Sequence, residues 1–171
     1  MLDKNVAALL NEQIMKELYS AYLYLDMANY YSVEGLEGFE NWFYMQAQEE
    51  RDHAMLIRKY LLNNDEKVTL LPIDAPNEPY NNFGDPLNKA LEHERTVTAS
   101  IHNIFAAAVA VHDYRTMDFL NWFVREQGEE EKNTSDLITK YKLFGSDAKA
   151  LYELDQELKA RAYAAPSLVM D

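Results

Sequence analysis

The sequence predicts an all-α protein, namely a four-helix bundle with one long crossover and a short fifth helix at the C-terminus. Gly and Pro are rare, with five of each in 171 residues, and they gather in a few short segments. The stretches between them have the length of helices and are rich in Leu, Ala, Glu, Gln, Met and Tyr. No segment alternates apolar and polar residues in the manner of a half-buried strand.

The positions of Gly, Pro and capping residues delimit the helices. The predicted helices span about 3–33, 39–63, 85–112, 113–144 and 147–163, and the last eight residues are predicted to be a tail. Gly35 and Gly38 lie in the first turn, and Asp113 and Gly145 mark the two ends of the fourth helix. We assign residues 1–145 to the bundle and 146–171 to a short helix and tail of the same domain.

Loop lengths set the predicted topology. The first and third connections are short, so each joins an antiparallel pair of helices. The segment between the second and third helices has about 20 residues and contains Pro72, Pro76, Pro79 and Pro86. Twenty extended residues reach roughly 66 Å, whereas a helix of 28 residues is roughly 42 Å long. This loop can therefore run back along the bundle and leave the second and third helices parallel.

Composition and charge exclude several classes of function. There is no Cys, which excludes disulfide frameworks, thiolate metal sites and cysteine nucleophiles. The net charge is −13, so the chain lacks the basic surface of a nucleic-acid or membrane-surface protein. The polar N-terminus lacks the apolar core of a signal peptide. We expect a cytoplasmic protein that binds neither nucleic acid nor membrane.

Polar residues interrupt the apolar seam that each helix should turn toward the core. The seams contain Glu17 in the first helix, Glu50 and His53 in the second, Glu94 in the third, and Gln127 and Glu130 in the fourth. Within each antiparallel pair these positions lie within about one turn of the same height. Unpaired buried carboxylates are costly, so acids on four helices need one shared explanation.

A pair of bound divalent cations provides that explanation, because metal charge compensates the carboxylates. Oxygen ligands with one imidazole favour iron or manganese over copper or structural zinc. His53 follows Glu50 by three residues, so both lie on one face of the helix, and Gln127 and Glu130 repeat that spacing. Each residue taken singly is more often a surface acid or a core histidine; the prediction depends on their occurrence together on four helices.

Three segments resemble bacterial non-haem ferritins. They are LNEQIMKELYSAYLYLDMA in the first helix, AQEERDHA in the second and FLNWFVREQGEEEK in the fourth. The resemblance covers nearly the whole chain and implies roles for single residues. Glu17, Glu50 and His53 match the ligands of a first iron, with Glu50 bridging. Glu94 and Glu130 match those of a second iron, with Gln127 beside it.

The resemblance also implies a third, inner-facing iron site and a tyrosine beside the di-iron centre. The third site would comprise Glu49, Glu126, Glu129 and Glu130. The tyrosine is Tyr24, for which electron donation, a hydrogen bond to Glu94 or Glu130, and simple core packing all remain open.

Two departures from related patterns refine this expectation. The fourth helix carries Gln127 and Glu130 where di-iron oxygenases have a second Glu-x-x-His, which implies a weaker second site and suits iron that passes through. Arg51 occupies the position of the haem-binding methionine of bacterioferritins, so we expect no haem.

The function implied is iron storage with ferroxidase activity. Fe(II) would be oxidised by O2 or H2O2, and ferric oxyhydroxide would be stored inside a hollow shell of 24 identical subunits, with the fifth helix lining pores on its four-fold axes. Two alternatives stay open: a di-iron or di-manganese oxidoreductase acting on peroxide or an organic substrate, and a subunit without oxidase activity. The complete ligand set counts against the second.

Large apolar residues off the predicted seams also indicate an oligomer. They are Tyr19, Tyr22, Tyr30, Tyr31, Trp42, Tyr44, Phe83, Trp122 and Phe144, together with the crossover stretch 68–73. Exposed together, they would form patches larger than monomers usually carry, and a closed symmetric assembly would bury them.

Overall fold

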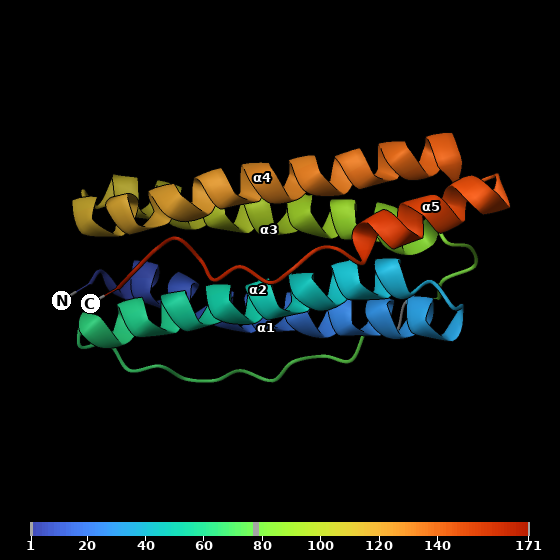
Figure 1. The fold of residues 1–171 in the computed structure, drawn as a ribbon. Helices are drawn as coiled ribbons and strands as arrows, with labels where there is room; N and C mark the ends of the chain where they lie inside the picture. The colour runs from blue at the N-terminus through green and yellow to red at the C-terminus, as the bar shows by residue number, and fades with distance from the viewer. Residues whose placement is uncertain (1, 77–78, 171) are drawn as a thin grey trace.

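The chain folds into five α-helices. A computed structural model describes residues 2–76 and 79–170; residues 77–78 of the predicted crossover and residues 1 and 171 lie outside the described residues. The helices are α1 (Lys4–Val33), α2 (Glu37–Asn63), α3 (Asp85–Ala110), α4 (Tyr114–Phe144) and α5 (Ala148–Leu158). The α1–α2 hairpin forms one layer and the α3–α4 hairpin the other (Figure 1). None of the described helices is both long and apolar enough to cross a membrane.

The crossover between α2 and α3 runs along the outside of the first hairpin (Figure 1). Two hydrogen bonds of 2.8 Å tie it to α1: Asn11 Nδ2 donates to the carbonyl of Thr69, and the backbone N–H of Thr69 donates to Asn11 Oδ1. Farther along, the hydroxyl of Tyr80 donates to Asp26 of α1 at 3.0 Å. The predicted fold class and its long crossover are confirmed.

Aspartates cap three of the helices. Asp3 accepts backbone N–H groups at the start of α1, Asp113 does so for α4 as predicted, and Asp147 does so for α5. Helix α2 has no capping side chain of its own. Its first N–H groups are instead satisfied by Asp155 of α5, whose Oδ1 accepts from Gly38 at 2.7 Å and from Phe39 at 3.1 Å.

Two predicted boundaries are wrong, both because of α5. Helix α2 begins at Glu37, so Gly38 lies in its first turn and not in the loop; a Cβ there would lie 1.7 Å from the carbonyl oxygen of Asp155. Helix α5 ends at Leu158 and not near 163. The side-chain nitrogen of Asn41 donates a hydrogen bond to the carbonyl of Leu158 at 3.2 Å. Farther along the chain, Pro166 disfavours helix in the residues that directly precede it.

The core consists of two apolar clusters separated by a polar layer. One cluster gathers around Leu10, Ile57 and Ile101, and the other around Met27, Phe39 and Leu87. The seam predicted for α3 is Leu87, Leu91, Glu94, Thr98, Ile101, Phe105 and Ala108. Leu87, Glu94, Ile101 and Ala108 are buried as predicted, but Ala90, Val97 and Ile104 are buried in place of Leu91, Thr98 and Phe105, which are only partly so. The prediction takes steps of four and then three residues, whereas the structure has steps of three and then four; both fit a heptad repeat. The seams predicted for the other helices are buried, apart from the partly buried Tyr141 of α4.

The bundle is wider on one side than on the other. Helices α1 and α3 approach closely, whereas no Cα atoms of α2 and α4 come within 8 Å of each other in the described chain. Residues 159–170, which we call the C-terminal segment, run back along this wide side (Figure 1). Trp122 Nε1 donates to Ser167 at 2.9 Å, and Leu168 and Met170 pack against the first apolar cluster.

The contact between Asp155 and α2 generates a stability prediction. Asp155 is 3 % exposed and caps a helix other than its own. Asp155→Ala should lower the free energy of unfolding by about 1–2 kcal/mol, because two buried N–H groups lose their acceptor. Denaturant unfolding followed by circular dichroism measures this. Asp147→Ala, which removes an exposed cap of α5 alone, should cost less; equal losses would contradict the prediction.

Candidate metal centre

The polar layer between the two apolar clusters is built by all four long helices. Glu17 comes from α1, Glu50 and His53 from α2, Glu94 from α3 and Glu130 from α4; all are at most 4 % exposed. Four acids from separate segments are thus shielded from water in one layer. Such a layer needs protons or cations to be tolerated.

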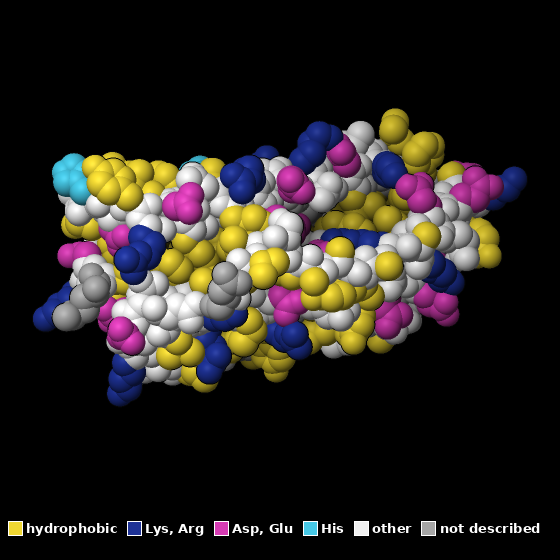
Figure 2. Space-filling view, turned by 60° about the vertical axis from the view of Figure 1, so that its left-hand side comes forward, with side chains coloured by type: hydrophobic (Ala, Val, Ile, Leu, Met, Phe, Trp, Pro, Cys, Tyr) yellow, Lys and Arg dark blue, Asp and Glu magenta, His cyan; other side chains and the backbone are white. Residues whose placement is uncertain are grey.

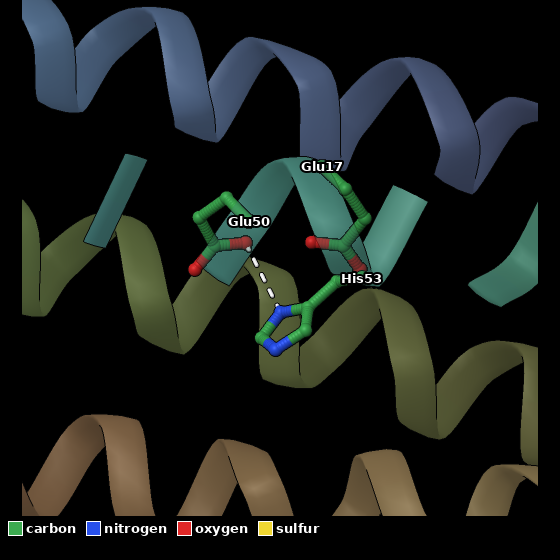
Figure 3. A group of neighbouring side chains, drawn as sticks. All are labelled: Glu17, Glu50 and His53. Carbon is green, nitrogen blue, oxygen red and sulfur yellow. Dashed lines mark ion pairs between the residues drawn. The ribbon is translucent and has the colours of Figure 1, made fainter. Parts of the chain in front are cut away.

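Glu17, Glu50 and His53 form the centre of this layer (Figure 3). One ligand atom from each lies within 4.8 Å of the other two, and His53 Nδ1 is 3.4 Å from Glu50 Oε2. Among the described residues, the buried side-chain N and O atoms without a hydrogen-bond partner are Glu17 Oε2, both oxygens of Glu50, and His53 Nδ1. All four belong to this group of three. Donor atoms that converge without partners are the arrangement a metal ion satisfies.

A second group of three shares the histidine. His53, Glu126 and Glu130 also place one ligand atom each within 4.8 Å of the others, and His53 Nε2 is 3.9 Å from Glu126 Oε1. Glu126 is only partly buried, because it faces the wide side between α2 and α4. Glu94 lies outside both groups. The two groups therefore place one imidazole between two sets of carboxylates.

Glutamine amides hold three of the four buried carboxylates. Gln13 donates to Glu17 at 3.0 Å, Gln46 donates to Glu130 at 2.7 Å, and Gln127 donates to Glu94 at 3.0 Å. Glu50 is the one carboxylate of the four without such a donor among the described residues. Three acids are thereby held in place, whereas Glu50 has no glutamine donor and lies 3.4 Å from His53 Nδ1.

The orientation of two of these amides follows from their other partners. Ser100 donates to Gln13 Oε1 at 2.6 Å, and Lys16 in turn donates to Ser100 at 3.0 Å. Arg161, which can only donate, lies against Gln46 Oε1. In both glutamines the oxygen is occupied, so the nitrogen faces the carboxylate. The sequence prediction missed Gln13 and Gln46 as site residues; the spacing of Gln13, one turn before Glu17, was the available signal.

Burial and mutual repulsion raise the pKa values of three acids in this layer, Glu50, Glu94 and Glu130. Burial raises the pKa of Glu50 far above its ordinary value, and the charges of Glu94 and Glu17 add to the effect. Burial, then Glu94, raises the pKa of Glu130 to about 8. Burial also raises the pKa of Glu94, although its hydrogen bonds from Tyr24 and Gln127 oppose the shift. Without a cation, the layer holds protons near neutral pH, and a bound cation displaces them.

Tyr24 contacts this layer through Glu94. Its hydroxyl donates to Glu94 Oε1, and its ring is buried beside Phe43 with ring centroids 5.8 Å apart. Burial and the nearby carboxylates raise the pKa of Tyr24 well above its ordinary value. The sequence left Glu94 and Glu130 open as partners of this hydroxyl, and the hydroxyl donates its hydrogen bond to Glu94. Tyr24 is therefore a protonated donor that helps to hold this acid.

The outer acids lie at the wide side of the bundle and are not brought together in one group. Glu49 forms an ion pair with Arg161 at 2.6 Å, and Glu129 is exposed. Burial, followed by the charges of Glu129 and Glu49, raises the pKa of Glu126, although His53 opposes the shift. Glu49 and Glu129 thus influence Glu126 through their charge while lying outside both groups of three.

Fold and site together define a class of protein. Four long helices with one crossover enclose a carboxylate-rich layer with one histidine, so the chain is a four-helix bundle of the kind that binds two metal ions between its helices.

The comparisons with known proteins specify the family. A ferritin-like domain model matches residues 7–144. Bacterial non-haem ferritins from Campylobacter jejuni and Staphylococcus epidermidis are 38 % and 37 % identical to this chain. The matches cover 93 % and 95 % of the chain and 95 % and 98 % of those proteins. The chain belongs to the ferritin family, an iron-storage family.

Solved structures agree with this assignment. An Archaeoglobus fulgidus ferritin engineered into a closed form superposes with a TM-score of 0.93 at 38 % identity, covering 96 % of this chain and all of that one (100 %). An open-pore ferritin from the same archaeon superposes with a TM-score of 0.92 at 38 % identity, covering 94 % and 98 %. The predicted resemblance to bacterial non-haem ferritins is confirmed.

The raised pKa of Glu130 generates a prediction of pH dependence. Its folded pKa of about 8 exceeds its ordinary value of 4.5. Between these values the folded metal-free protein binds more protons than the unfolded chain, so its stability falls as pH rises through this window. We expect a loss on the order of a few kcal/mol between about pH 5 and about pH 8. Thermal unfolding in the presence of a chelator measures it.

Glu130→Gln should make this dependence shallower, because the Glu130 proton is no longer lost, while Glu50 and Glu94 keep raised pKa values. Glu129→Gln removes an exposed acid from the same helix and serves as the matched control, with an unchanged slope. A metal-free wild type that gains stability from pH 5 to 8 would refute the assignment.

Proposed function

We propose that this protein is a ferroxidase that binds two Fe(II) ions in the polar layer, oxidises them and passes the product on for storage. The observation that carries the proposal is the set of four buried, partnerless atoms on Glu17, Glu50 and His53. Their chemistry, carboxylate oxygens with one imidazole nitrogen, suits iron. Fe(II) is the substrate here, so it is expected to occupy the site transiently.

The ligand roles we propose start from the two groups of three and follow the family resemblance for Glu94. Glu17 and His53 hold the first ion, and Glu50, which has no glutamine donor, bridges the two ions. Glu130 and Glu94 hold the second ion, with Gln127 beside them. Ion binding releases the protons that the layer carries, since only ionised carboxylates are good ligands.

The residues contribute positioning and charge, and the redox chemistry is that of the iron. Each of the two Fe(II) ions gives up one electron, and O2 or H2O2 accepts the pair. Carboxylates stabilise Fe(III) more than Fe(II), which favours this transfer. Gln13 and Gln127 keep Glu17 and Glu94 in place during the change of charge. Tyr24 keeps its proton and its hydrogen bond to Glu94.

Asymmetry of the site supports the release of iron. The first group is fully buried, whereas the second includes the half-buried Glu126, and its helix carries Gln127 and Glu130 where a second Glu-x-x-His would stand. We propose that the oxidised ion leaves by this weaker side, past Glu126 and the exposed Glu129. Arg51 at the position of a haem-binding methionine supports a protein without haem.

We also propose a cytoplasmic shell of 24 subunits. Of the nine off-seam aromatic residues, Tyr31, Trp42 and Trp122 pack inside the chain itself and do not contribute to a surface patch. Many large apolar side chains remain exposed, and a symmetric shell would cover them. The most exposed are Val33 (86 %), Val169 (83 %), Tyr114 (72 %) and Leu70 (70 %). The number 24, and α5 as the lining of the four-fold pores, come from the family resemblance.

The oxidation proposal is tested by removing one ligand from each half of the centre. His53→Ala and Glu94→Ala should each slow the rapid phase of Fe(II) oxidation by about 100-fold or more, as the loss of a metal ligand does. Stopped-flow absorbance after mixing anaerobic Fe(II) protein with O2 measures the rate. Thermal stability of the metal-free variants should stay near wild type; for Glu94→Ala the reason is that removing a buried acid relieves repulsion. Rapid oxidation at the wild-type rate in either variant would refute the proposal.

The assembly is tested by light scattering coupled to size-exclusion chromatography at near-physiological salt. We expect one particle with the mass of 24 chains of 19.9 kDa. A chain truncated after Gly145 should keep the bundle folded and retain iron less well. A stable monomer or isolated dimer of the full chain would overturn the shell.

A further inference from the structure

The C-terminal segment brings a guanidinium group to the inner edge of the metal centre. Arg161 Nη2 lies 2.6 Å from Glu49 Oε2 and also donates to Gln46 Oε1. Its Nη1 donates to the carbonyl of Trp42 at 3.1 Å, and the guanidinium lies over the Trp42 ring at 4.9 Å from the centroid. This arginine is held on several sides, and one of its partners is an acid predicted to bind the third iron.

Through Gln46 the same guanidinium is linked to the dinuclear centre. An arginine side chain only donates hydrogen bonds, so it turns the oxygen of Gln46 toward itself. The nitrogen of Gln46 then faces Glu130 Oε2, at 2.7 Å. Arg161 is therefore two hydrogen bonds from a carboxylate of the second group.

The position of Arg161 is set by its backbone. Asn41 of α2 donates to the carbonyls of Leu158 and Arg161 at 3.2 and 3.0 Å, which fixes the chain where it leaves α5. Two residues on, the hydroxyl of Tyr163 donates to Asp52 of α2. The ferritin-like domain match ends at residue 144. Arg161 and Tyr163 therefore lie outside the matched region, whereas their partners on α2 lie within it.

We propose that Arg161 is a built-in cation that occupies the Glu49 side of the third iron position and must be displaced before an ion binds there. The proposal rests on the ferroxidase function proposed above. While Arg161 holds Glu49, that carboxylate already has a cationic partner, and Glu126 and Glu129 alone make a weak cation site. The ion pair between Arg161 and Glu49, which we call the latch, is thus autoinhibitory: it limits the centre to two ions when iron is scarce.

The surroundings allow the latch to open. A hollow of about 380 Å³ lies beside Arg161, between Trp42 and Leu158 on one side and Asn133 and Asp136 of α4 on the other (Figure 2). The guanidinium can swing into it without unfolding the segment. An arginine stays charged at all physiological pH values, so a cation that competes with Arg161 for Glu49 opens the latch. Two ions in the dinuclear centre add positive charge nearby and so favour its release.

The test is a calorimetric titration of the assembled, metal-free protein with Zn²⁺, a redox-inert probe. The wild type should bind two ions per subunit tightly and a third weakly. In Arg161→Gln the third ion should bind about tenfold tighter, because a charge-assisted hydrogen bond no longer competes. Arg161→Lys restores the charge and should return the third affinity toward wild type. The first ion, which Glu17 and His53 hold, should bind alike in all three proteins, because Arg161 reaches only the second group, through Gln46 and Glu130.

Two matched variants show whether the gain belongs to the latch. Lys159→Gln removes the same charge from the same segment, at a residue paired with the distant Glu37, and should leave the third ion unchanged. Adding Glu49→Gln to Arg161→Gln should abolish the gain, because Glu49 is the released ligand. The same gain in Lys159→Gln, or its survival without Glu49, would overturn the proposal, as would an unchanged third affinity in Arg161→Gln.

A crystal of the wild type soaked in Zn²⁺ decides the matter even if Arg161→Gln does not assemble. The expected result is an ion on Glu49 with Arg161 displaced from it. An ion bound to Glu49 beside an unmoved Arg161 would refute the latch, and so would a third ion bound without Glu49. Failure of the ferroxidase proposal is distinct, because the wild type would then fail to bind the first two ions tightly.

Discussion

The burial of four carboxylates and an imidazole in one layer is the constraint on which the rest of this structure depends. The layer lies between two apolar clusters, and desolvation there raises the pKa values of Glu50, Glu94 and Glu130. Such a layer is tolerable only when protons or cations neutralise it. Glutamines donate hydrogen bonds to three of the acids but not to Glu50. Four buried ligand atoms of the layer are therefore left without a hydrogen-bond partner in the described part of the chain and are available to a metal ion.

The unequal spacing of the helices gives this layer two different sides. Where α1 and α3 approach closely, Glu17 is buried and held by Gln13. Where α2 and α4 stay apart, the acids Glu126 and Glu129 reach toward solvent and the C-terminal segment fills the gap. A centre that is closed on one side and open on the other suits an ion that is bound, oxidised and released, and it is less suited to a permanently bound cofactor.

Helix α5 and the C-terminal segment connect the end of the chain to the site. Asp155 satisfies the first N–H groups of α2, the helix that carries Glu50 and His53. Three residues after α5 ends, Arg161 reaches Glu49 and Gln46 on the same helix. One short stretch therefore both stabilises the start of α2 and places a positive charge beside its acidic residues. This coupling makes the last part of the chain a component of the metal centre.

The sequence by itself determined the helices, the crossover and the acids of the buried layer, because these depend on local periodicity, capping residues and the distribution of Gly and Pro. Glu50 and His53 are three residues apart on one helix, so their position on a common face follows from helix geometry alone. The tertiary structure decided which residues of α3 lie in the core between Leu87, Glu94, Ile101 and Ala108, since steps of three-then-four and of four-then-three residues both fit one helix and only the neighbouring helices distinguish them. It also decided the contact of Arg161 with Gln46, across 115 residues. No local pattern encodes such a pair, because it exists only after the bundle has packed and the segment has settled on its wide side.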